Sequence, residues 1–378
     1  MDRAMRKHMA AEAQIPGTPP PRRRPRILTI ILLILALLAL IHFIATTHSA
    51  YPTVKISDCT DLIRNTDYKK FIQVNSKTQV LDEIQFVDQL VGDQPASLVT
   101  VADTGPDHRL DAYVYGCARG ASTPTLTLLF KKQGLLQGSV KVTQDNALSI
   151  GEQDPGLTQD ISTLQDPLQE NVYHEYVWQN GTFVQKPFAG LYPVTSRSEA
   201  EAMQEQANNG QTYPWTDPVS TAQQMAKDIL QLTNAKTTLE ENNGHMARVQ
   251  IEQETPHLVV SVTLMRLLQN DNHGLWFVTQ AHSPDMTIDA LHQPLSSPIT
   301  IHGNMTYQED WHASITLFDH TLSPLRVLNE PEFKAWGDGS YSAKIAYTNN
   351  LANQPGLLLI KVVGSGEGQL LLSSALLG

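Results

Sequence analysis

An uninterrupted apolar run at residues 27–46 is the strongest feature in the hydrophobic pattern of this chain. The run carries no charged residue, and four arginines stand directly before it, between residues 22 and 26. A helix rises ~1.5 Å per residue, so about 20 apolar residues cross the hydrocarbon core of a bilayer. Basic residues beside a membrane helix stay in the cytoplasm. The pattern therefore predicts a transmembrane helix at 27–46, a disordered cytoplasmic tail at 1–26 and an extracytoplasmic remainder.

The same run has a second interpretation, a cleaved signal peptide. The apolar part of a signal peptide has about 7–15 residues and ends at small residues in an A-x-A-like pattern. Here the run is longer, and a cleavage site after Ala50 would place His48 three positions before the cut. We therefore favour an uncleaved signal-anchor in the cell membrane, and the sequence leaves cleavage open.

After the run, the pattern changes to short β-prone segments separated by Gly, Pro and Asp. Such segments predict strands, here at residues 97–102, 110–115, 125–130 and 138–143. Apolar residues at helical spacing predict one helix over 80–90. Asn180-Gly181 lies between two further strand-like runs and predicts a tight hairpin, because both residues accept positive φ. We expect residues 51–191 to form a strand-rich extracytoplasmic domain, either as one fold or as two pieces.

Residues 192–282 have a different pattern. Ser196 and Glu199 form a capping box that opens a helix, and Asp217-Pro218 opens a second one. Alternating apolar segments then predict antiparallel strands at 246–252, 258–267 and 275–280. Helices followed by an antiparallel meander predict a small α+β domain.

Residues 284–378 contain short strand-like runs with turn residues at about every 8–12 positions, the spacing of a β-sandwich. The segments 294–305, 307–319, 337–347 and 355–363 resemble the bacterial spore germination immunoglobulin-like domain. The resemblance implies an immunoglobulin-like sandwich that serves as an extracellular interaction module, with a link to sporulation or germination. The chain departs from that pattern at 322–335, which is long and irregular, and at 369–378, which is unusually apolar. In the middle region, Gly274–Val278 resembles the last strand of NTF2-like domains.

The charge distribution excludes one class of partner. The first 26 residues carry seven Lys or Arg and two carboxylates, a balance of +5. Because the whole chain has a net charge of −11, the remainder carries −16. A protein that binds nucleic acid needs a basic patch to neutralise phosphates. We therefore expect no nucleic-acid partner.

The chain has two cysteines, Cys59 and Cys117. Two cysteines in an extracytoplasmic segment are more often bonded to each other than reactive. We predict a Cys59–Cys117 disulfide, with two free buried thiols as the alternative. No Cys-x-x-Cys spacing is present.

The motifs that would indicate catalysis or metal binding are missing from the sequence. Thirteen histidines are present without a His-Glu-x-x-His pattern, and we expect most of them at the surface. Gly364–Gly368 has the spacing of a nucleophile elbow, but an elbow needs a helix after the serine. A β-prone run follows instead, so a hairpin loop is expected. We expect the five tryptophans to lie mostly in cores. The sequence predicts no catalytic, cofactor-binding or metal-binding residue.

The first functional hypothesis is therefore a non-enzymatic, membrane-anchored binding or assembly protein, which holds a protein or cell-wall partner through its C-terminal domain. An uncovered sheet edge or a row of surface aromatics would support it. The first alternative is an envelope-directed hydrolase with its site in residues 51–282, which requires a concave pocket with converging carboxylates or histidines. The second is a single-pass sensor or secretion-type assembly subunit.

Overall fold

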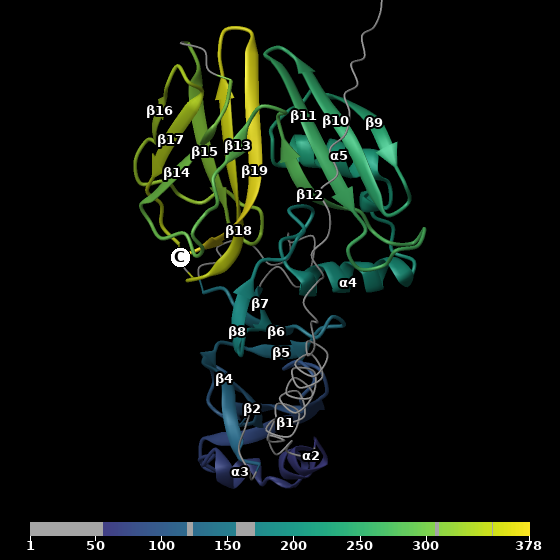
Figure 1. The fold of residues 1–378 in the computed structure, drawn as a ribbon, viewed down its shortest axis with the longest axis vertical. Helices are drawn as coiled ribbons and strands as arrows, with labels where there is room; N and C mark the ends of the chain where they lie inside the picture. The colour runs from purple at the N-terminus through teal and green to yellow at the C-terminus, as the bar shows by residue number, and fades with distance from the viewer. Residues whose placement is uncertain (1–55, 119–123, 156–170, 307–309, 350) are drawn as a thin grey trace, which may run out of the picture. The chain divides into compact units, whose positions relative to one another are not determined.

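The computed structural model describes residues 56–378, except 119–123, 156–170, 307–309 and 350 (Figure 1). Strands are the commonest element of these residues, and they are arranged in four sheets. The first sheet has the order β1-β2-β3-β4, and every pair is antiparallel. Its strands are β1 (Gln79–Val87), β2 (Ala96–Asp103), β3 (Leu110–Cys117) and β4 (Leu126–Leu135).

The second sheet has the order β5-β6-β7-β8. Its strands are β5 (Ser139–Val142), β6 (Leu148–Gln153), β7 (Asn171–Gln179) and β8 (Thr182–Lys186). The two sheets share a core in which Leu98 and Val114 of the first sheet cluster with Leu148 and Ile150 of the second. The predicted hairpin is confirmed: Asn180 and Gly181 join β7 to β8 with φ angles of 52° and 87°.

Two short helices, α2 (Ile56–Asn65) and α3 (Tyr68–Phe71), pack on the first sheet. Tyr68 is buried in a cluster with Val99 and Tyr113, and its hydroxyl group lies 2.5 Å from that of Ser97. The predicted disulfide is also confirmed, because Cys59 of α2 is bonded to Cys117 at the end of β3.

Removal of this disulfide should destabilise the first sheet. The bond joins residues 58 positions apart, and chain-entropy arguments assign about 4 kcal/mol to a loop of that length. We expect the double variant Cys59→Ser/Cys117→Ser to lower the free energy of unfolding of residues 56–186 by about that amount. Urea unfolding followed by hydrogen exchange of β2 and β3 measures this loss of unfolding free energy. Equal protection in variant and wild type would contradict the expectation.

The helix predicted over residues 80–90 is wrong, because strand β1 occupies 79–87. The strand contains an irregularity between Leu81 and Glu83, where its register against β2 shifts by one residue. Such a bulge breaks the two-residue alternation of side chains. The apolar residues on either side of the bulge therefore fall at a spacing that resembles a helix.

Residues 192–282 contain the expected helices, α4 (Arg197–Asn208) and α5 (Pro218–Asp228), and a meander of four strands. Ser196 caps α4 by accepting a hydrogen bond from the backbone N–H of Glu199, and Asp217 caps α5 through that of Ser220. The strands are β9 (Lys236–Asn242), β10 (Met246–Glu254), β11 (His257–Met265) and β12 (Phe277–His282). The alternating apolar pattern predicts the last three strands but not β9.

The C-terminal strands divide between two sheets. One four-stranded sheet has the order β13-β14-β17-β16. Its members are β13 (Thr287–Ile288), β14 (Ile299–Asn304), β16 (Glu332–Ala335) and β17 (Ser340–Ile345). The others, β15 (His312–Phe318), β18 (Gln354–Val363) and β19 (Glu367–Leu377), continue the meander in a seven-stranded sheet, β15-β18-β19-β12-β11-β10-β9.

The fold class expected from the sequence, a transmembrane helix followed by separate modules, is wrong. The seven-stranded sheet crosses the expected boundary near residue 283, so the α+β part and the C-terminal sandwich share one sheet (Figure 1). No helix in the part of the chain that the structure describes is both long and apolar enough to span a membrane. The expected tail and membrane helix, residues 1–26 and 27–46, lie outside the described residues.

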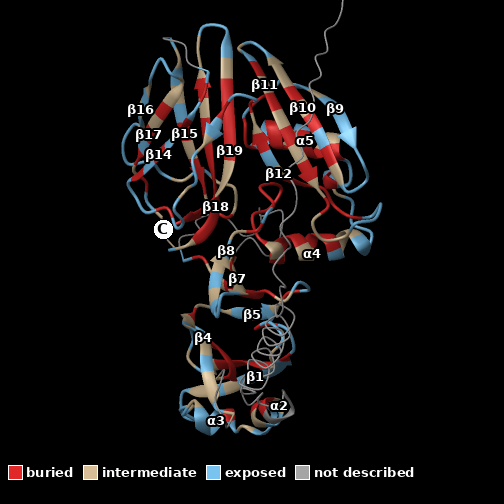
Figure 2. Ribbon diagram, viewed as in Figure 1, coloured by how far each residue is buried: buried red, intermediate tan, exposed pale blue. Residues whose placement is uncertain are grey.

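Strands β18 and β19 are buried on both faces, as Figure 2 shows by their predominantly buried positions. Leu359 and Leu370 pack in the core of the α+β part, while Ile360 and Leu371 pack in the core of the sandwich. A strand covered on both sides needs continuous rather than alternating apolar residues. This two-sided burial explains the unusual apolarity of residues 369–378.

Candidate binding surface

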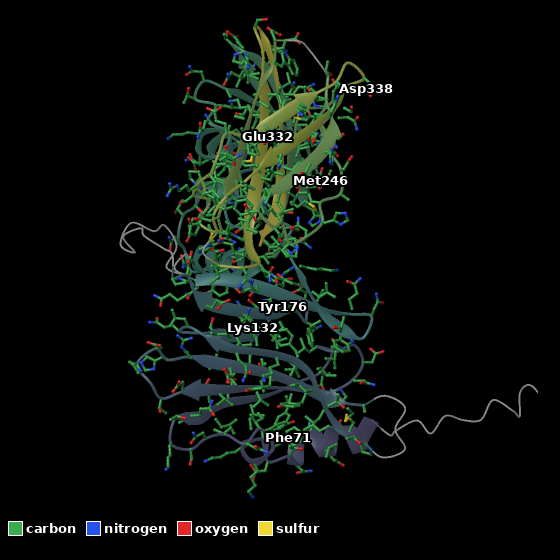
Figure 3. All side chains as sticks on the ribbon, turned by 90° about the vertical axis from the view of Figure 1, so that its left-hand side faces the viewer. Phe71, Lys132, Tyr176, Met246, Glu332 and Asp338 are labelled. Atoms are coloured by element: carbon green, nitrogen blue, oxygen red, sulfur yellow. A yellow bond between two sulfur atoms is a disulfide. The ribbon has the colours of Figure 1, made fainter. Side chains whose placement is uncertain are left out.

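The outer strand of the C-terminal four-stranded sheet leaves one edge without a strand partner among the described residues. β16 pairs only with β17 in that part of the chain. The preceding segment continues the same edge: Val327 bridges Tyr347, and the backbone N–H of Leu328 donates to the carbonyl oxygen of Ala346. We call residues 326–336 the β16 edge. It lies at the left of Figure 1 and faces the viewer in Figure 3, where Glu332 is labelled.

The β16 edge exposes large apolar side chains. Leu328 is 57% exposed, Trp336 47% and Val327 38%, so three of the ten exposed large apolar residues of the described chain lie in this short stretch. Exposed apolar groups that gather in one place are typical of interaction sites, whereas single ones are ordinary. The charged residues Glu330, Glu332 and Lys334 are also exposed. The β16 edge therefore exposes both apolar and charged side chains.

The core side of the edge is fixed. The ring of Phe333 stacks on that of Tyr341, with 5.6 Å between centroids. After β16, Gly339 adopts a positive φ of 87°, and its N–H donates to the carbonyl oxygen of Trp336. A side chain at position 339 would meet the carbonyl oxygen of Met305 at 2.8 Å. The edge is thus presented on a rigid hairpin.

A second set of exposed apolar residues lies on the first sheet and on α3, which packs against it. Phe71, Phe86 and Leu128 are about half exposed, and Ile84 is also exposed. β1 is the edge strand of that sheet. This set differs from the β16 edge, since the bulge in β1 interrupts the regular backbone that an added strand would pair with.

The glycine-rich segment expected to be a hairpin loop is one. Gly364 donates its N–H to the carbonyl oxygen of Glu367, and β19 begins at Glu367. Because a strand and not a helix follows Ser365, the segment lacks the geometry of a nucleophile elbow.

The expectations for aromatic residues and histidines hold in part. Trp215 and Trp276 are buried in the core of the α+β part, whereas Trp336 is exposed. His302 and His312 lie at the surface. His174 and His320 do not, since they are only 1% and 2% exposed. The expectation of surface histidines is therefore wrong for these two, and both contact carboxylates.

The described residues contain several cavities that could hold a small ligand, among them one of about 470 Å³ beside Glu252 and Glu254. A second, of about 340 Å³, lies where β12 and β19 separate, and its lining includes His282 and Ser373. A third, of about 390 Å³, lies beside α4 and is lined by Glu201 and Glu205. Lys141 donates to one Glu201 oxygen at 2.7 Å, whereas the other oxygen, Oε1, is buried without a hydrogen-bond partner among the described residues. Within the described residues, no three His, Cys, Asp or Glu side chains converge as metal ligands.

Comparison of the chain with protein-family models, with curated proteins and with solved structures gives no match. The resemblances to the spore germination immunoglobulin-like domain and to NTF2-like domains therefore stay predictions from the sequence.

Proposed function

We propose that this protein is an extracytoplasmic, non-enzymatic binding or assembly protein that holds a protein partner through the β16 edge. The single observation that supports the proposal most is the exposure of Leu328 and Trp336 beside a strand edge that has no partner among the described residues. An extended peptide can add a strand to such an edge, where its backbone pairs and its side chains supply specificity. The Cys59–Cys117 bond supports an oxidising compartment outside the cytoplasm.

The chemistry of the edge defines the kind of partner. Side chains of an added strand alternate between the two faces of the sheet. Leu328 and Trp336 offer apolar contact at the two ends of the edge, and Glu332 and Lys334 offer charge between them. The expected ligand is an extended segment with apolar side chains near its ends and charged residues of either sign in its middle.

The test is capture of a partner from solubilised membranes by the full-length protein and by the double variant Leu328→Asp/Trp336→Asp. Each substitution places a charge where the partner's apolar surface would be buried, and a buried unpaired charge is costly. Because hot-spot side chains contribute about 2 kcal/mol or more, we expect binding at least ~30-fold weaker.

The matched control is Leu239→Asp, since Leu239 is 44% exposed on β9, the edge strand at the far end of the seven-stranded sheet. The control should retain the partner. Retention by both variants would contradict the role of the β16 edge. Capture of no partner by the wild type would contradict the binding function itself. It would favour the alternative function, hydrolysis of envelope polymers, at the cavity of about 390 Å³ beside α4.

The proposed location is the cell membrane, with the N-terminus in the cytoplasm and the bulk of the chain outside. It is supported by the charge asymmetry of the sequence, in which residues 1–26 are basic and the remainder acidic. Fractionation of cells followed by protease treatment of intact spheroplasts tests it. Digestion of the C-terminal region from outside is the expected result, and full protection would contradict it.

A further inference from the structure

The two parts of the described chain, residues 56–186 and 188–378, meet through polar contacts. None of the five hydrophobic cores contains residues from both parts. Instead, the hydroxyl groups of Ser149 and Ser198 lie 2.6 Å apart, and Arg197 forms an ion pair with Glu175. A junction without shared apolar packing depends on its hydrogen bonds and charges. Its strength therefore responds to protonation more than a hydrophobic interface does.

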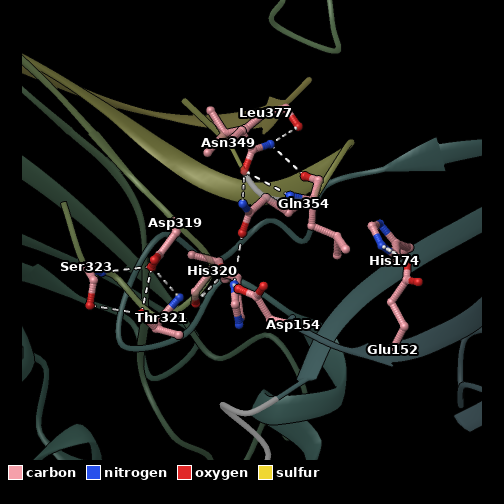
Figure 4. A network of polar contacts seen from close by, with 12 residues as sticks. Glu152, Asp154, His174, Asp319, His320, Thr321, Ser323, Asn349, Gln354 and Leu377 are labelled. Carbon is pink, nitrogen blue, oxygen red and sulfur yellow. Dashed lines mark hydrogen bonds and ion pairs between the residues drawn. The ribbon is translucent and has the colours of Figure 1, made fainter. Parts of the chain in front are cut away.

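One buried histidine of this junction faces two oxygen atoms. The Nε2 atom of His174, on β7, lies 3.1 Å from Oε1 of Glu152 on β6 (Figure 4). Its Nδ1 atom lies 3.2 Å from the carbonyl oxygen of Asn353, in the C-terminal part. Both oxygens only accept hydrogen bonds, so both ring nitrogens must carry a proton for both bonds to form. Only the charged imidazolium ring can donate to both oxygens at once.

A neutral His174 has a different partner. The Nε2 atom of Gln185, on β8, lies 3.2 Å from Nδ1 of His174 and donates to the carbonyl oxygen of Asn353 at 2.8 Å. When Nδ1 loses its proton, it can accept the second amide hydrogen of Gln185. The bond from His174 to Asn353 is then lost, while the N-terminal part stays satisfied. Loss of one proton thus removes one of the two contacts that hold Asn353.

The second buried histidine faces the next residue of the chain. The Nδ1 atom of His320 lies 3.0 Å from Oε1 of Gln354 and 3.9 Å from Oδ2 of Asp154. The amide nitrogen of Gln354 donates to Oδ1 of Asn349, which leaves its oxygen to face His320. Asp154 lies just after β6, two residues beyond Glu152. Two carboxylates at one end of β6 therefore face two imidazoles that contact Asn353 and Gln354 (Figure 4).

The other titratable groups nearby have defined roles. Lys132 of β4 lies 3.8 Å from Oε1 of Glu152. The hydrogen bond from His174 is the largest influence that lowers the pKa of Glu152, and the charge of Lys132 adds to it. Tyr176 of β7 has its pKa raised to about 12, mainly by burial and also by Glu152, so it stays neutral. Asp319 precedes His320, and its Oδ1 atom accepts hydrogen bonds from Thr321 and Ser323.

We propose that His174 forms a proton-operated latch that holds Asn353 against β6 and β7, closed when its ring is charged. His320 can donate to Gln354 from Nδ1 in its neutral form as well, so that contact does not depend on charge. The latch opens when Nδ1 of His174 loses its proton, because that nitrogen can then no longer donate to Asn353. It also weakens when Glu152 is protonated, because the imidazolium ring then loses its counter-charge.

The experiment is hydrogen exchange of the full-length protein at pH 5.5 and pH 8.0, corrected for the intrinsic rate, read in peptides that cover residues 351–357. In the wild type we expect opening about tenfold more frequent at pH 8.0, since one hydrogen bond of ordinary strength corresponds to about that factor. His174→Gln should reduce this difference. His302→Gln, at an exposed histidine of β14, should leave it unchanged.

The more conservative variant Glu152→Gln gives the second measurement. It keeps the shape of the side chain and an acceptor oxygen but removes the charge that favours the imidazolium ring. It should reduce the pH difference even where a histidine variant fails to fold. Equal protection of the wild type at both pH values, or a pH difference that persists in folded variants at positions 152 and 174, overturns the proposal.

Discussion

A protein truncated after Ser283 is expected to lose the folded structure of residues 188–283, although these residues contain a complete meander and two helices. The reason is the shared sheet. The core of the α+β part includes five large residues from beyond the truncation, Phe318, Leu357, Leu359, Leu370 and Leu372. Burial of such side chains contributes roughly 1.5–3 kcal/mol each. Their combined loss is comparable to the total stability of a domain, about 5–15 kcal/mol.

Limited proteolysis of the truncated protein, followed by mass spectrometry, measures this effect. Residues 56–186 serve as the internal control, because their cores contain no residue from beyond 183. We expect a resistant fragment from this part with its disulfide intact, and rapid digestion of residues 188–283. Resistance of both parts would mean that the α+β part folds without β18 and β19, as separate modules would.

The parts of the fold that follow from neighbouring residues could be predicted from the sequence. The capping box of Ser196 and Glu199 starts α4, and Asn180-Gly181 turns β7 into β8. The alternation in β11 is visible in its burial, since Leu258, Val260, Val262 and Leu264 are all fully buried. In each case the physical cause lies within a few residues of the element that it determines.

The continuous sheet could not be predicted in this way, because pairing of β19 with β12 joins residues that are about 90 positions apart. Ala281 pairs with Leu372, and His282 with Leu371. The sequence did contain a sign of it in the apolar residues 369–378. A strand at the surface of a sandwich alternates between apolar and polar residues, whereas a strand with a core on each face does not. A continuously apolar strand indicates that a second layer covers it, but it does not show which part of the chain forms that layer.

The sequence predicts the candidate surface and the buried histidines less clearly than it predicts the elements above. The irregular stretch 322–335 contains β16, which is too short for a strong alternating pattern. His174 lies in β7, two residues after the fully buried Val172, so the alternation of the strand places it on an inward face. Its partner Asn353 is 179 residues away along the chain. The contact that gives His174 its proposed role is therefore not visible in the sequence.

Two neighbouring residues of β18 should report on the two cores separately. Leu359 faces the core of the α+β part, and Ile360 faces the core of the sandwich. Leu359→Ala and Ile360→Ala each remove a buried side chain, which costs about 2–5 kcal/mol. Because both residues belong to one sheet, we expect each variant to shift the same cooperative unfolding transition of residues 188–378. Urea unfolding read by hydrogen exchange at β10 and at β17 measures the shift on both sides.

The comparison of β10 with β17 decides between one folding unit and two. In a single unit, Ile360→Ala lowers protection at β10 as much as at β17, although Ile360 packs only in the sandwich core. With two independent modules, Ile360→Ala would affect β17 alone and Leu359→Ala would affect β10 alone. His312→Ala, at an exposed position of β15 in the same sheet, should leave both readings unchanged. Strand β18 would then contribute to both cores, so the C-terminal sandwich would not fold separately from the α+β part.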